Sequence, residues 1–147
     1  MKKMFISAVA AIVLAGSTYA SDTPLWLRNN SIAPDGTKIA FTYKGNIYTV
    51  NAEGGKAEQI TSNPSYDSTP IWTKDGKHII FASYRQKSKD IYKVASHGGI
   101  PERITTHTGN ETPLATLADG SILFTANIQQ DATYGDFPGN AQLYKIG

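Results

Sequence analysis

A pattern of about 40 residues occurs three times along this chain of 147 residues. Each copy holds an Asp-Gly pair, then an apolar segment with a phenylalanine, then an Ile-Tyr or Leu-Tyr pair. In the first two copies the aspartate precedes the phenylalanine by six residues, and 15 residues separate the isoleucine of the "IT" dipeptide from the next aspartate. Such regular spacing is typical of repeat proteins, in which every copy forms one structural unit. The pairs are Asp35-Gly36, Asp75-Gly76 and Asp119-Gly120.

Each copy predicts four short strands rather than helices. The segments "KIAFTY", "HIIFAS" and "SILFTA" are β-rich and apolar at consecutive positions, which indicates strands covered on both faces. The Asp-Gly and Gly-Gly pairs have the chemistry of tight turns between strands. Four antiparallel strands per copy, with both faces buried, form one blade of a β-propeller. We therefore predict an all-β fold, a partial β-propeller of about three four-stranded antiparallel blades, at about residues 25–62, 66–106 and 111–147.

The third copy is predicted to be incomplete. It has the Asp-Gly turn and the strand "QLYKI", but the chain ends at Gly147, where the Gly-Gly turn and a fourth strand would come next. A propeller needs about four to eight blades to close. We therefore expect these residues to be the N-terminal part of a longer protein, and the bare blade faces to make the chain self-associate when it is expressed alone.

Residues 1–20 have the layout of a secretory signal peptide. Two lysines precede an apolar stretch from Met4 to Gly16, and the small residues of "STYA" precede a predicted cleavage after Ala20. The apolar stretch is 13 residues long, shorter than the roughly 20 that a membrane-spanning helix needs. We expect an exported protein, periplasmic or extracellular, without a stable membrane span.

Composition excludes several other classes of protein. Without the leader, 12 basic residues face 12 acidic ones, so no basic surface for nucleic acid is expected. The chain has no cysteine and therefore no disulfide or thiolate metal site. Its three histidines are not in a metal-binding spacing, and no Gly-x-Ser-x-Gly elbow is present. We expect no catalytic residue, cofactor or metal in this segment.

Two features of the repeat have a functional and a structural interpretation. Trp72 could be a stacking platform for a ligand, but filling the space between blades is the favoured role. The third copy carries a longer segment, "NIQQDATYGDFPGN", in the position of the "YKGN" hairpin of the first copy. Because loops on rigid scaffolds often carry binding residues, its Tyr134, Phe137 and Pro138 form a candidate interaction loop, and a surface insertion without a role is the alternative.

The second copy contains the pattern Pro-x-Trp-x-x-Asp-Gly-Lys, Ile-x-Phe-x-Ser, Asp-Ile-Tyr, Gly-Gly and Arg-Ile-Thr, from Pro70 to Thr105. It resembles the blade repeat of TolB, of prolyl-oligopeptidase propellers and of tricorn proteases. Together with the leader, "TPLWLRNNSIAPDGTKIAFTYKGNIYTV" resembles the N-terminus of exported tricorn-like serine peptidases. In the third copy the tryptophan position is occupied by Thr116, which departs from the pattern.

That resemblance implies a non-catalytic propeller segment that gates or docks peptide or protein substrates. Proteolysis would then belong to protease domains elsewhere in a parent chain, whose remaining blades would be further partners. A TolB-like propeller that binds proteins at the cell envelope is the alternative from a different class. A prolyl-oligopeptidase type of enzyme is a third.

Overall fold

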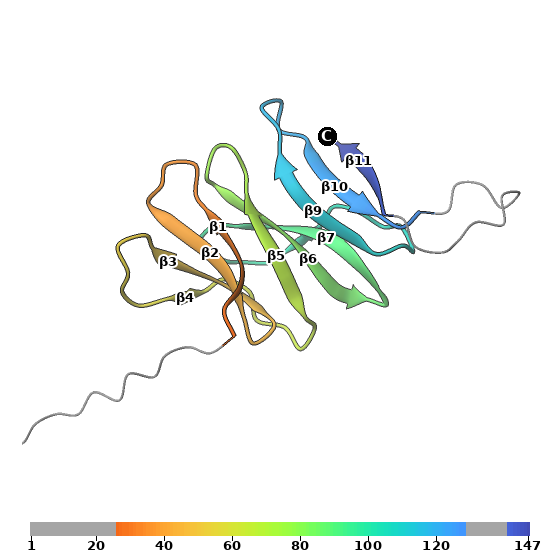
Figure 1. Cartoon of the computed structure of the whole chain (residues 1–147). Helices are drawn as coiled ribbons and strands as arrows, with labels where there is room; N and C mark the ends of the chain where they lie inside the picture. Colours follow the sequence, from red (N-terminus) through yellow and green to blue (C-terminus); the bar gives the residue numbers. More distant parts are fainter. Residues whose placement is uncertain (1–25, 129–140) are drawn as a thin grey trace, which may run out of the picture.

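The computed structural model describes residues 26–128 and 141–147, and these residues form strands and turns without a helix. The strands make three separate antiparallel sheets, which succeed one another along the chain and lie side by side (Figure 1). We call the sheets blades 1, 2 and 3. None of them closes back on another, so the all-β, partial-propeller architecture predicted from the repeat is confirmed.

Blades 1 and 2 each have four strands in sequential order, and blade 3 has three. Blade 1 consists of β1 (Arg28–Ile32), β2 (Lys38–Tyr43), β3 (Asn46–Asn51) and β4 (Glu58–Gln59). Blade 2 consists of β5 (Asp67–Trp72), β6 (His78–Gln86), β7 (Ser88–Ala95) and β8 (Glu102–Arg103). Blade 3 consists of β9 (Glu111–Thr116), β10 (Ile122–Ala126) and β11 (Gln142–Ile146).

The Asp-Gly pairs form the turns between the first two strands of each blade. In blade 1 the Asp35 carboxylate accepts hydrogen bonds from the Thr37 amide at 3.0 Å and the Thr37 hydroxyl at 2.8 Å. Gly36 has a φ of 75°, a left-handed conformation that glycine adopts at little cost. The hydrogen bonds from Thr37 hold the pKa of Asp35 below its usual value. The predicted role of these pairs as turn residues is confirmed.

A tighter turn joins β2 to β3. Lys44 and Gly45 are its two central residues, with φ values of 49° and 77°. Positive φ at both positions is characteristic of a type I′ turn, whose twist matches that of the flanking strands. Asparagine is preferred at the first position, because an L-residue with a longer side chain is strained there. Lys44 therefore occupies a position for which its side chain is poorly suited.

Each blade carries a stacked phenylalanine–tyrosine pair on one face, which we call its front face. The ring centroids are 5.9 Å apart in blades 1 and 2 and 5.7 Å apart in blade 3, within the range of favourable aromatic pairs. In all three blades the two residues are direct cross-strand partners. The pairs are Phe41–Tyr48, Phe81–Tyr92 and Phe124–Tyr144.

The front face of one blade packs on the back face of the blade before it. Between blades 1 and 2, Phe81 and Tyr92 share a buried cluster with the smaller Ala40 and Ile47. Between blades 2 and 3, Phe124 shares a second cluster with residues from the back of blade 2. The members that define this second cluster are Ile80, Ile91, Ile122, Phe124 and Ala126.

Among the residues that the structure describes, only blade 2 has both faces covered. In β6 five consecutive residues are buried, from Ile79 to Ser83. In β2 and β10 buried and half-buried residues alternate instead, as in a strand covered on one side. Cover on both faces is therefore observed for the central strand of blade 2, while blades 1 and 3 each keep one bare face within the described residues, as expected for the two end blades of an incomplete propeller. The cause is position, because each end blade has a single neighbour.

The first strand of every blade contains an irregularity that the repeat did not predict. In blade 1 two residues, Asn29 and Asn30, lie opposite Phe41 alone, and in blade 2 Thr69 and Pro70 lie opposite Phe81. Such a bulge bends the strand and increases its twist. It also gives Pro70 a place in β5, because a proline has no amide hydrogen to donate to the neighbouring strand and a bulge does not require one.

We expect Lys44→Asn to stabilise the chain by about 0.5–1 kcal/mol, because asparagine adopts positive φ with less strain. The free energy of unfolding in urea is the measurement. Lys87→Asn is the matched control, since Lys87 lies in the next hairpin without positive φ. An equal gain from both substitutions would contradict the turn assignment.

Candidate functional site

The two ends of the blades differ in their connections. The Asp-Gly and Gly-Gly turns lie at one end of the sheets. At the other end lie the β2–β3 and β6–β7 hairpins and the blade-to-blade connections 60–66 and 104–110. We call this second end the hairpin end. Figure 1 shows the β5–β6 turn and the β6–β7 hairpin at opposite ends of blade 2.

The hairpin end exposes aromatic side chains. Trp26 is 73% exposed, and Tyr66 and Tyr84 are each 45% exposed. The tyrosines are neighbours, because the Tyr84 amide donates to the Tyr66 carbonyl at 3.4 Å. Single exposed rings are ordinary on a protein surface, but aromatic residues that gather at one end are typical of protein-binding surfaces.

Cationic side chains lie at the same end of the blades. Lys44 lies over the Tyr43 ring at 5.2 Å, and the Arg28 guanidinium lies over Trp26 at the same distance. Lys87 is exposed in the β6–β7 hairpin. The carboxylates that start the inner strands at this end, Asp67 and Glu111, are buried instead. The described part of the hairpin end therefore presents positive charge and aromatic surface.

Asp67 belongs to a buried polar network within blade 2. Its carboxylate accepts hydrogen bonds from the Ser83 hydroxyl at 2.5 Å and from Arg85 Nη2 at 2.8 Å. The guanidinium also lies 5.6 Å from the Phe81 ring centre and 5.4 Å from that of Tyr92. The Asp67 side chain has no exposure, and that of Arg85 is 15% exposed. Arg85 thus compensates a charge that water cannot reach.

A second network ties blade 2 to blade 3. The Thr105 hydroxyl accepts a hydrogen bond from the Ile91 amide at 2.9 Å and donates its own proton to the Glu111 carboxylate. Glu111 is 1% exposed. Burial raises the pKa of Glu111, and the hydrogen bond from Thr105 only partly opposes this. Asp90, close enough to raise the pKa of Glu111 further, forms an ion pair with Arg103, whose Nη2 lies 2.9 Å from Asp90 Oδ2.

The acidic residues of these two networks recur at a fixed position of the repeat. A comparison of only the strands and the turns does not identify them. Asp67 lies eight residues before Asp75, and Glu111 lies eight residues before Asp119. An acidic residue at the same position of two copies indicates a shared role. In blade 1 that position is occupied by Leu27, which is 51% exposed. The exposed Tyr66 and Tyr84 have no such periodic signal.

The candidate interaction loop with Tyr134, Phe137 and Pro138 lies outside the described residues. Trp72 is 5% exposed within the cluster between blades 1 and 2, and its indole nitrogen donates to the Ser31 carbonyl at 3.0 Å. Its favoured role as a filler between blades is therefore confirmed.

Within residues 26–128 and 141–147, no three histidine or acidic side chains gather closely enough to hold a metal ion. Over the same residues, no helix has the length and hydropathy to cross a membrane.

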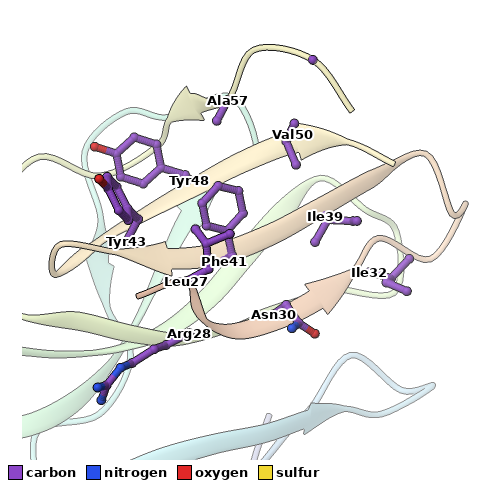
Figure 2. A pocket seen from close by; sticks show the side chains of 11 residues that line it. Leu27, Arg28, Asn30, Ile32, Ile39, Phe41, Tyr43, Tyr48, Val50 and Ala57 are labelled. Atoms are coloured by element: carbon purple, nitrogen blue, oxygen red, sulfur yellow. The ribbon is translucent and has the colours of Figure 1, made fainter. Parts of the chain in front are cut away.

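The front face of blade 1 forms an open apolar hollow of ≈ 660 Å³ (Figure 2). The Phe41–Tyr48 pair lies in its middle, flanked by Ile39 and Val50. In blades 2 and 3 the equivalent residues are covered by the preceding blade. This hollow is therefore a blade-packing surface without its neighbour, rather than a pocket shaped for a small molecule.

We expect Arg85→Ala to destabilise the fold by about 3 kcal/mol, because it leaves the Asp67 carboxylate buried without its partner. The matched control is Lys93→Ala, which removes the exposed ion pair between Lys93 and Glu102 and should cost less than about 1 kcal/mol. Urea denaturation of both variants is the measurement. Equal effects would show that the buried network contributes no more than a surface pair.

Glu111 should give stability a distinct pH dependence. Because the pKa of Glu111 is raised in the folded state, folding favours the protonated form of this side chain. The resulting stabilisation of the folded state is present at low pH and is lost as the pH rises through the folded-state pKa. Glu111→Gln mimics the protonated form, so its stability relative to the parent should increase from pH 4 to pH 7. Urea denaturation at both pH values is the measurement, with the exposed Glu102→Gln as control. A relative stability that falls with pH would contradict this assignment.

Comparison with known families gives a match over almost all of the described chain. The family model described as the tricorn protease N-terminal β-propeller domain matches residues 24–145. Among curated proteins, the Tol-Pal system protein TolB of Bordetella pertussis is 43% identical over 54 residues, and that of Desulfosudis oleivorans is 33% identical over 60 residues. These matches cover 36% and 38% of this chain, but only 12% and 14% of the relatives.

Solved structures agree on the fold. A putative TolB from Agrobacterium tumefaciens superimposes with a TM-score of 0.67 at 21% identity, over 84% of this chain and 51% of that one. The tricorn protease superimposes with a TM-score of 0.64 at 20% identity, over 82% of this chain and 12% of that one. At such identities the likeness concerns the fold alone.

Proposed function

The chain belongs to the family of tricorn protease N-terminal β-propeller domains, and on that premise we propose that it is the non-catalytic propeller segment of an exported tricorn-like serine peptidase. It docks or gates peptide and protein substrates. The cleavage is carried out by protease domains of a longer parent chain. The observation that carries this proposal is the family match over residues 24–145.

The distribution of ionisable side chains supports a binding role. Asp67, Asp90 and Glu111 are buried in hydrogen bonds and ion pairs within and between the blades. These carboxylates therefore stabilise the propeller and are not presented to a partner. The hairpin end, with its exposed Tyr66 and Tyr84 and its cationic side chains, is the described surface that a partner can contact. We place substrate docking there.

A second candidate function is that of a TolB-like envelope protein that binds other proteins. It is favoured by the identity of 43% to the TolB of Bordetella pertussis, although that match covers only 54 residues. We propose export for both candidates, on the signal-peptide pattern of residues 1–20. Those residues lie outside the described part of the chain.

A binding measurement tests the docking surface. Fluorescently labelled, unfolded casein peptides should bind the chain, and Tyr66→Ala with Tyr84→Ala should weaken binding at least tenfold, since aromatic residues dominate such interfaces. Ile100→Ala is the matched control, because Ile100 is 97% exposed in the β7–β8 connection at the opposite end. Anisotropy titration gives the affinities. Equal binding by both variants would remove the hairpin end from the proposal.

The two candidates predict different continuations of the gene beyond residue 147. A reading frame that continues for several hundred residues into a PDZ-like region and a serine-protease region supports the peptidase. A frame that stops after about six blades supports the TolB-like protein, and an α/β-hydrolase elbow indicates a prolyl-oligopeptidase type of enzyme. Binding of purified Pal in preference to unfolded peptides would also favour the TolB-like role.

A further inference from the structure

Exposed carboxylates are distributed unevenly between the two ends of the described blades. All of them belong to the Asp-Gly or Gly-Gly turns, or to the first residue of the outer strand that follows a Gly-Gly turn. They are Asp35, Glu53, Glu58, Asp75, Glu102 and Asp119. Within residues 26–128 and 141–147, no exposed carboxylate lies at the hairpin end. Exposed negative charge is therefore confined to the opposite end of the described blades.

The acidic residues that the structure describes at the hairpin end are buried. Asp67 forms an ion pair with Arg85 at 2.8 Å, and its side chain has no exposure. Asp90 is equally buried and forms an ion pair with Arg103 at 2.9 Å. Glu111 is 1% exposed. None of these carboxylates is therefore available to neutralise a cation on the surface.

Three lysines at this end form no ion pair with a described carboxylate. Lys44 and Lys87 are exposed in the β2–β3 and β6–β7 hairpins. Lys89 is half-buried, and burial lowers its pKa. The direction of this shift indicates that no nearby carboxylate compensates the burial of the Lys89 charge. A carboxylate supplied by a partner would compensate it.

Two exposed tyrosines lie between these two hairpins. A Cβ atom on Gly45 would come within 3.2 Å of the Tyr66 ring, so this ring lies directly against the turn that carries Lys44. The Tyr84 amide donates to the Tyr66 carbonyl at 3.4 Å, and Lys87 follows Tyr84 in the same hairpin. Aromatic and cationic residues of blades 1 and 2 thus adjoin one another. We call this region the tyrosine–lysine surface.

The conformation of Lys44 is a second sign of function at this surface. Its φ of 49° is strained for a lysine, and the turn favours asparagine at this position. Strained residues cluster at functional sites, where the strain is compensated elsewhere in the structure. Asparagine would relieve the strain but would remove the positive charge. A binding role for that charge accounts for lysine at a position where the turn itself disfavours it.

We propose that the tyrosine–lysine surface binds acidic peptide segments. Carboxylates of the segment face Lys44, Lys87 and Lys89, and its apolar or aromatic side chains pack on Tyr66 and Tyr84. The inference rests on the proposed function, because it names the class of substrate segment that docks at the hairpin end. A peptide is favoured over an anionic lipid surface, since exposed tyrosines beside cations offer both packing area and hydrogen bonds to side chains.

Three fluorescently labelled peptides of equal length test the preference for negative charge. The first alternates glutamate with glycine and phenylalanine, the second has glutamine in place of every glutamate, and the third has lysine there. In anisotropy titrations of the full chain at about 0.01 M salt, the glutamate peptide should bind about tenfold more tightly than the glutamine peptide, because exposed charges are little screened. The lysine peptide should bind most weakly. At about 1 M salt the advantage of the glutamate peptide should fall to about twofold or less.

A pair of double variants locates the preference on the molecule. Lys44→Gln with Lys87→Gln should remove most of the advantage of the glutamate peptide. Lys74→Gln with Lys77→Gln is the matched control, because it removes two exposed lysines at the opposite end and changes the net charge equally. The control should keep the advantage, and circular dichroism should show the same β-sheet signal for both variants. An equal loss in both would mean that net charge alone is responsible and would overturn the proposal.

The remaining outcomes separate this inference from the proposed function. Equal affinities for the three peptides would overturn the acidic preference and leave substrate docking at the hairpin end standing. No binding of any peptide would overturn docking at the hairpin end, and the acidic preference with it. Tighter binding to phosphatidylserine vesicles than to the glutamate peptide, lost in the variant at Lys44 and Lys87, would assign the surface to a membrane and overturn the proposal.

Discussion

The packing of one blade's front face on another blade's back face is the interaction on which this molecule depends. A single twisted sheet has two broad faces, and in the central strand of blade 2 both are apolar. Burying a phenylalanine or isoleucine side chain contributes about 1.5–3 kcal/mol, and each interface buries several of them. A blade alone would leave these side chains in water. Stability in such a chain is therefore a property of the junctions more than of the sheets.

Polar contacts fix the relative position of the blades that apolar packing brings together. The Trp72 indole donates to blade 1 through the Ser31 carbonyl, and the Thr116 hydroxyl of blade 3 donates to the Trp72 carbonyl at 2.8 Å. Hydrogen bonds are directional, whereas apolar contacts tolerate sliding. Adjacent inner strands thus have one defined register. Glu111 and Thr105 act similarly nearer the hairpin end.

Much of this fold could be predicted from the sequence because the repeat is local. The Asp-Gly turns, the order of the strands and the buried role of Trp72 depend on residues within one copy and its neighbour. The pairing of Asp67 with Arg85 could not be predicted, because it joins residues 18 positions apart through a network that also needs Ser83. The bulge at Thr69 also escaped prediction, since a β-branched residue at positive φ contradicts local preference.

The candidate site was less predictable than the fold, for a physical reason. The repeat constrains side chains that pack between blades, and these recur at fixed spacing. The backbone hydrogen bond between Tyr84 and Tyr66 recurs in blade 3 between Asn127 and Asn110, so the repeat fixes the backbone there but not the exposed side chains, and no periodicity marks the tyrosines. Their closeness arises from a blade-to-blade connection that lies beside the end of β6, which only the three-dimensional arrangement reveals.

The segments that join the second and third strands of the blades grow along the chain while the paired rings stay in register. The phenylalanine and the residue before the tyrosine are six residues apart in the first copy, ten in the second and 19 in the third. In each case the Phe and Tyr remain direct cross-strand partners. The length of these segments can therefore change without disturbing the packing of the blades. The sequence of these segments can also diverge independently of how the blades are assembled.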